Sequence, residues 1–157
     1  MNILKDSVCI ILLLSGILKL IYIKYTVSTI TLIDVFPSKI SKYIGYLLPL
    51  LEISMAVLLY EINEKLVYVF IIGYLMFFII INLKFIYQDK KCCCYGRLIK
   101  SKLGLGGVIH YTYWLMVIII DILVQKDYVN INFYSIILTL FLVSNSLIIR
   151  RLVEVTY

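Results

Sequence analysis

Long runs of apolar residues dominate the pattern along this chain, and they predict helices that cross a membrane. Five runs are long enough, since about 17–25 mainly apolar residues span the hydrocarbon core of a bilayer. In chain order they cover residues 7–23, 43–60, 66–83, 103–124 and 128–149. Each must be helical, because backbone amides and carbonyls cannot stay unpaired in lipid. The pattern therefore predicts an all-α integral membrane protein, a four-helix transmembrane bundle plus a fifth C-terminal transmembrane helix.

The polar stretches between the runs are of two lengths. Residues 61–65 and 125–127 suit tight helical hairpins, whereas residues 24–42 and 84–102 form longer loops. Successive helices alternate in direction, so both long loops and the C-terminus are expected at one end of the bundle. Pro37, in the first long loop, predicts a break in the chain before a short interfacial helix.

Composition agrees with a membrane location. Hydrophobic residues make up 63% of the chain, whereas about half of a soluble domain is apolar. The net charge is +6, and the basic residues lie at the ends of apolar runs, which favours lipid headgroups over nucleic acid as the partner. We expect one compact membrane unit, with residues 1–125 forming the four-helix domain and residues 126–157 the fifth helix and a short basic tail.

Two charged residues inside the predicted spans are candidates for a functional pair. Lys19 lies about one turn from the end of the first span, and Glu52 about two turns from the same end of the second. An unpaired charge in lipid costs at least ~2.5–3.5 kcal/mol. Lys19 alone could extend to the headgroups, but Glu52 is deeper and shorter. Pro49, three residues before Glu52, can leave a backbone carbonyl free for a ligand or a neighbouring helix.

His110 and Cys9 are two further chemically active residues inside the spans. His110 lies among tyrosines in the first turns of the fourth span, a position typical of the aromatic belt at the interface. Alternatively it joins Lys19, Pro49 and Glu52 in an intramembrane polar site. Cys9 is expected to be a buried small hydrophobic residue.

Three consecutive cysteines in the second long loop form the densest reactive cluster of the chain. They are Cys92, Cys93 and Cys94. A disulfide across one intervening residue closes a small strained ring, and such bonds suit exchange better than structure. The neighbouring Lys90 and Arg97 favour the thiolate form. Other interpretations are a coincidental run, a lipidation site or a soft-metal site, and we expect no metal because consecutive cysteines cannot easily converge on one ion.

Three short motifs, in this order along the chain, resemble the MauE family, a branch of the MauE/DoxX-like redox-associated membrane proteins. They are Gly16-x-x-Lys19, Pro49-x-x-Glu52 and Cys92-x-Cys94-Tyr95-Gly96. The resemblance covers roughly residues 7–125. It implies that Cys92 and Cys94 are a redox pair and that Lys19, Pro49 and Glu52 occupy the family's intramembrane positions. Cys93 stands at the variable position, so a third thiol leaves the pairing ambiguous.

Thiol–disulfide chemistry of exported proteins is the function that this resemblance implies. The chain would be a thiol–disulfide oxidoreductase of the cell membrane, exchanging electrons between a thioredoxin-like protein or a cysteine-containing exported client and a membrane acceptor. A quinone is the candidate acceptor, and the direction of electron flow stays open. The alternatives are a non-catalytic accessory or immunity protein of a peptide export or modification cluster, and a small transporter that uses Lys19 and Glu52 as a charge relay.

Two arguments about membrane orientation disagree. Most basic residues lie at the end of the long loops, and only Lys5, Lys65 and Lys126 lie at the other end. The positive-inside rule therefore favours a cytoplasmic cysteine loop. The role implied by the resemblance favours the extracytoplasmic face, which is the orientation we expect.

Overall fold

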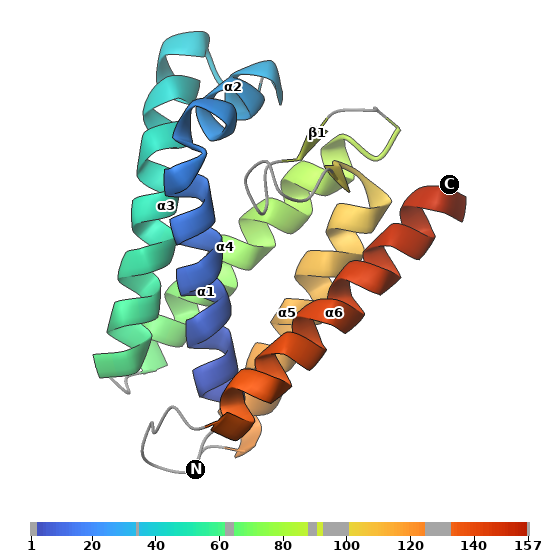
Figure 1. Cartoon of the computed structure of the whole chain (residues 1–157). Coiled ribbons are helices and arrows are strands. Elements are labelled where there is room, and N and C mark those ends of the chain that lie inside the picture. Colours follow the sequence, from blue (N-terminus) through green and yellow to red (C-terminus); the bar gives the residue numbers. More distant parts are fainter. Residues whose placement is uncertain are drawn as a thin grey trace.

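The computed structural model describes residues 3–33, 35–61, 65–87, 91–92, 101–124 and 133–156, which form helices and one small pair of strands (Figure 1). The helices are α1 (Ile3–Ile21), α2 (Ile23–Ile33), α3 (Ser38–Glu61), α4 (Lys65–Lys84), α5 (Leu105–Val124) and α6 (Phe133–Thr156). The strands β1 (Lys91–Cys92) and β2 (Ser101–Lys102) pair antiparallel.

The predicted all-α membrane architecture is confirmed. Helices α3, α4, α5 and α6 are each long and apolar enough to cross a membrane, and α1 with α2 gives a fifth candidate span that bends by 93°. The two expected hairpin turns fall on residues 62–64 and within residues 125–132, outside the described residues.

The last helix continues beyond its predicted end at residue 149. It is described from Phe133 and continues to Thr156. The prediction ended the span before Arg150, because consecutive charges normally mark the headgroup region. Instead Arg150 forms an ion pair with Glu154 one turn later, which allows the charged segment to remain helical.

The short helix lies before Pro37 rather than after it, so that part of the prediction was wrong. Pro37 instead precedes the first turn of α3, where a missing backbone N–H costs little. Its carbonyl accepts a hydrogen bond from the Ser41 amide (3.0 Å). The Ser41 hydroxyl donates to the carbonyl of Phe36 (2.9 Å), and together these bonds fix the entry of the chain into α3.

A sharp turn at Tyr22 separates α1 from α2. Thr26, in the first turn of α2, is buried and donates a hydrogen bond to the carbonyl of Lys19 at 3.3 Å. Carbonyls at a helix C-terminus lack partners within their own helix, so this side chain stabilises the end of α1. If α1 crosses the bilayer, the 93° bend directs α2 along its surface.

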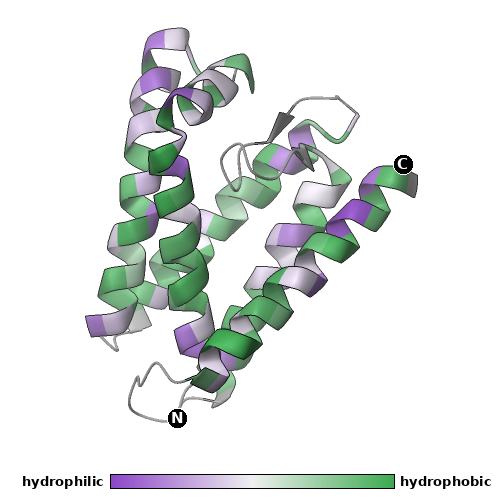
Figure 2. Ribbon diagram, in the orientation of Figure 1, coloured by the Kyte–Doolittle hydropathy of each residue, from purple (hydrophilic) through white to green (hydrophobic). Residues whose placement is uncertain are grey.

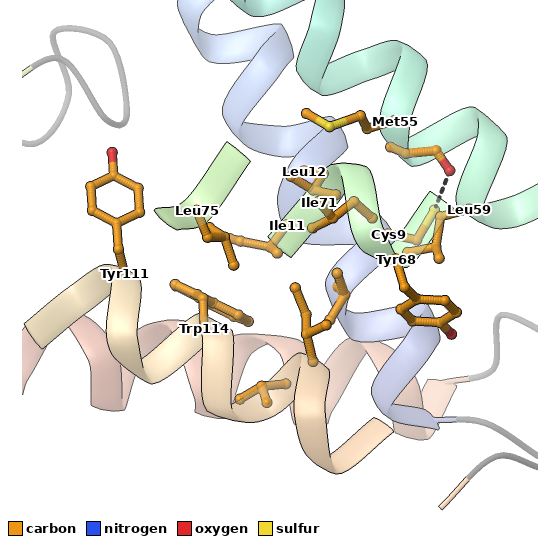
Figure 3. Packing of buried hydrophobic residues seen from close by; sticks show 14 of the residues in the cluster. Cys9, Ile11, Leu12, Met55, Leu59, Tyr68, Ile71, Leu75, Tyr111 and Trp114 are labelled. Carbon is orange, nitrogen blue, oxygen red and sulfur yellow. Dashed lines mark hydrogen bonds between the residues drawn. The ribbon is translucent and has the colours of Figure 1, made fainter. Parts of the chain in front are cut away.

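Helix α1 is central in the bundle and contacts α2, α3, α5 and α6. Its close approach to α3 depends on Gly16, where an added Cβ would lie 2.7 Å from Ile53 Cγ1 and 3.0 Å from the Pro49 carbonyl oxygen. Small residues allow membrane helices to pack at such short separations. Figure 3 shows the apolar core formed by α1, α3, α4 and α5, in which Leu59 and Ile71 are almost fully buried.

Hydrophobic residues predominate along the helices (Figure 2), and many large apolar side chains are exposed, as expected for contact with lipid. On α4, Leu66, Val69 and Phe70 are each more than 60% exposed, which would be unfavourable in water. Helix α2, strand β1 and the C-terminus lie at one end, and the N-terminus at the other (Figure 1). The described parts of both long loops therefore lie at the same end of the bundle as the C-terminus, as predicted.

Candidate functional site

A buried ion pair joins α1 to α3. Lys19 Nζ pairs with Glu52 Oε1, and each of the two side chains is only 3% exposed. The pairing that the sequence predicted is therefore present. The alternative, in which Lys19 extends to the headgroups, is wrong because its side chain turns inward to the carboxylate.

Two further donors bind the same carboxylate. Ser15 donates to Glu52 Oε2 at 3.0 Å, and the hydroxyl of Tyr74, on α4, donates to Oε1. Three helices thus meet at one carboxylate. A buried charge is tolerated only when its partners replace water, and here an ammonium and two hydroxyls do so.

The local sequence accounts for this meeting point. Ser15 and Lys19 are four residues apart, so they lie on one face of α1. Gly16, between them, brings that face against α3. Pro49 is buried inside α3 without ending it, and its carbonyl oxygen packs against Gly16. The two intramembrane motifs are therefore in direct contact.

His110 lies in the interior of the bundle rather than in an interfacial belt. It is 3% exposed, and its Nδ1 is hydrogen-bonded to Ser146 Oγ of α6 at 2.6 Å. Its ring also packs edge-on against Tyr111. The belt interpretation was wrong because a hydroxyl of the last helix supplies the polar partner that interfacial water would otherwise supply.

A cavity of about 50 Å³ lies beside these residues, and we call it the central cavity. This volume holds one or two water molecules. Its polar end carries Ser15, Lys19, Glu52, Tyr74, His110, Tyr111 and Trp114, and the rest of its wall is apolar. Trp114 Nε1 is buried and has no hydrogen-bond partner among the described residues.

A second space of about 50 Å³, the apolar cavity, lies next to the central cavity. The two share Lys19 and Tyr111. Its remaining walls come from α2, α3, α4, the segment between α2 and α3 (Val35 and Phe36) and Leu103, and they are aliphatic or aromatic. Leu103 directly follows strand β2, so this cavity adjoins the strand pair.

The structure describes only the start of the cysteine motif. Cys92 belongs to β1, and its backbone pairs with Ser101 of β2. Helix α2 contacts β1, at the same end of the bundle as Lys19. Cys93 and Cys94 lie outside the described residues. Within the described ranges, no group of three or more His, Cys, Asp or Glu side chains could hold a metal ion.

Cys9 is far from this site along α1. It is 2% exposed, and its thiol donates to the carbonyl of Ala56 at 3.2 Å. The prediction that Cys9 is a buried small residue is confirmed.

A separate polar cluster lies at the opposite end of the bundle. Asp121 accepts a hydrogen bond from Tyr68 at 2.8 Å. Lys5 and Asp6, in the first turn of α1, are also buried. These groups join the ends of α1, α4 and α5 and do not line the central cavity.

Sequence reasoning missed four residues around the central cavity. They are Ser15, Tyr74, Trp114 and Ser146. Tyr74 stands in an uncharged apolar run, so nothing in its local sequence marks it as a partner of Glu52. The spacing of Ser15 and Lys19 is the one local signal that could have identified a member of this set.

Comparison with known proteins gives one match. The sequence profile of a protein family described as methylamine utilisation protein MauE matches residues 1–124. No curated protein and no solved structure matches the chain. Helix α6 lies beyond the matched residues.

Proposed function

Because the chain belongs to the MauE family, we propose that this multi-pass membrane protein performs thiol–disulfide exchange, with Cys92 and Cys94 as the redox pair. The observation that carries the proposal is the buried contact between Lys19 and Glu52. Two family motifs meet there, at the end of the bundle from which the cysteine loop extends. A charge pair maintained inside lipid is a strong sign of function.

The proposed exchange conserves atoms and electrons. A thiolate of a thioredoxin-like protein or an exported client attacks the Cys92–Cys94 disulfide and forms a mixed disulfide. The second thiolate of that partner then resolves the mixed disulfide. The partner leaves oxidised, and Cys92 and Cys94 have gained two electrons and two protons. The reverse sequence reduces the partner, and the relative reduction potentials set the direction.

A quinone is the membrane acceptor that completes this proposal, since it can accept two electrons and two protons. The apolar cavity supports such a ligand, because its walls are aliphatic and aromatic and it adjoins β2. Lys19 and Tyr111 would supply its polar contacts. Its volume of about 50 Å³ is smaller than a quinone ring, so binding requires the walls to separate.

Cysteine replacement tests the exchange. Cys92→Ser and Cys94→Ser should each abolish it, whereas Cys9→Ser, at a buried thiol outside the loop, should leave it unchanged. The measurement is the ratio of reduced to oxidised client protein in cells, obtained by trapping thiols with a maleimide. Unchanged client oxidation in the Cys92→Ser/Cys94→Ser variant would refute the proposal. A phenotype that depends on Glu52 but not on these cysteines would favour an accessory protein.

Orientation is tested with a membrane-impermeant maleimide on intact cells, after reduction of the cysteines. An extracytoplasmic loop predicts labelling without permeabilisation. Cys9 contributes little background because it is buried. Labelling that occurs only after permeabilisation would place the loop in the cytoplasm.

A further inference from the structure

Helix α6 presents polar side chains to the bundle, although it lies outside the residues matched by the family. Its most buried residues are Ser135, Thr139, Ser146 and Arg150. Their spacing of four, seven and four residues places them on one face of the helix. The opposite face carries large apolar residues such as Leu140 and Phe141, which are more than 60% exposed. A helix that served only to fill space would be expected to bury apolar residues instead.

Ser146 makes the contact that reaches the site. Its hydroxyl lies 2.6 Å from His110 Nδ1, and the two side chains are 1% and 3% exposed. His110 in turn lines the central cavity together with Lys19 and Glu52. The hydroxyl therefore acts on the cavity through the imidazole.

The register of α6 against α5 is fixed one turn further on. An added Cβ at Gly106 would lie 2.9 Å from Glu154 Cγ and 3.3 Å from Arg150 Cγ. Arg150 is 2% exposed and is paired with Glu154 at 2.9 Å. Glycine at this position allows the two helices to approach closely. This contact sets the position of Ser146 along the axis of α6, so that it lies opposite His110.

We propose that α6 belongs to the functional site. Its Ser146 is a positioning residue that holds His110 toward the central cavity. This inference rests on the proposed thiol exchange, which releases or takes up two protons for each pair of electrons. His110 is the only histidine of the chain, and a neutral imidazole offers one N–H donor and one acceptor nitrogen. A fixed ring places a nitrogen at the cavity in a constant orientation and tautomer.

The single histidine makes this contact directly measurable. Protein labelled with ¹⁵N-histidine and purified without a histidine tag gives ring-nitrogen signals from His110 alone. Ser146→Ala should move the Nδ1 resonance, because its hydrogen bond is lost. Ser144→Ala is the matched control, since Ser144 is exposed and donates to the Leu140 carbonyl of its own helix. Ser146→Thr retains the hydroxyl and should keep the wild-type signal.

Exchange rates supply the functional half of the test. Ser146→Ala should lower the rate of client oxidation or reduction about tenfold, as expected for the loss of one hydrogen bond, and Ser146→Thr should restore it. An unchanged Nδ1 resonance in Ser146→Ala would overturn the proposal, as would a shifted resonance with a wild-type rate. Failure of the thiol function itself would appear separately, as an unchanged ratio of reduced to oxidised client in the Cys92→Ser/Cys94→Ser variant.

Discussion

Neutralising one member of the Lys19–Glu52 pair should destabilise the bundle more than neutralising both. Glu52→Gln removes the negative charge while keeping an oxygen that can accept hydrogen bonds from Ser15 and Tyr74. Lys19→Met removes the positive charge and keeps the length of the side chain. In each single variant the remaining charge is 2–3% exposed and has lost its counterion.

The magnitude follows from that burial. Removing one partner of a buried ion pair costs about 3–5 kcal/mol, because the other charge stays desolvated without compensation. Each single variant should therefore lose more than about a hundredfold in its ratio of folded to unfolded protein. The double variant contains no buried charge at this point. We expect its loss to be smaller than that of either single variant, so that it falls at least about 3 kcal/mol below the sum of the two single losses.

Trp114 provides the assay. It is the only tryptophan of the chain and is 5% exposed in the core, so its fluorescence reports unfolding of the bundle. Titration of mixed micelles with a denaturing detergent gives the free energy of unfolding of each variant. Glu61→Gln is the matched control, because Glu61 lies on the same helix and is exposed. That control should stay within about 0.5 kcal/mol of the wild type.

Additive losses in the free energy of unfolding would refute the proposed coupling between Lys19 and Glu52. If the loss in the double variant equalled the sum of the single losses within about 0.5 kcal/mol, the two side chains would not be coupled. Single losses no larger than that of Glu61→Gln would show that neither charge is buried in the folded protein.

Two further predictions concern packing away from the ion pair. Gly107→Ala should destabilise the protein by about 1–3 kcal/mol, because the new Cβ would lie 1.8 Å from Asn82 Oδ1, whereas Gly73→Ala, with nothing within 4 Å, should be neutral or slightly stabilising. An equal loss in both glycine variants, measured by the same titration, would contradict this explanation. Cys9 should react with a maleimide only after detergent unfolding, since it is 2% exposed, and mass spectrometry of the folded protein should find it unlabelled.

The spans and the ion pair could be predicted from the sequence because each depends on a strong local energy term. An apolar run of about 20 residues has few alternatives to a membrane helix. Pairing between a lysine and a glutamate at similar depths avoids the large free-energy cost of unpaired charges in lipid. These arguments need only the distance of each residue from the end of its span.

The surroundings of His110 and the position of α2 could not be predicted in this way. His110 differs from a belt residue only through Ser146, a residue of another helix 36 positions later. The short helix ends before Pro37, whereas proline statistics alone allow a break on either side. Both features depend on which helices become neighbours, and the hydropathy pattern does not contain that information.

The separation of Lys19 and Glu52 along the chain also sets a delay, during synthesis, between the appearance of the two residues. The two residues are 33 positions apart, and ribosomes add about 5–20 residues per second. Glu52 therefore leaves the ribosome roughly 2–7 s after Lys19. During that interval Lys19, in the last turn of α1, has no counterion, so we expect its ammonium group to lie among the lipid headgroups. We expect the insertion of α3 to be the step at which Lys19 turns inward and pairs with Glu52.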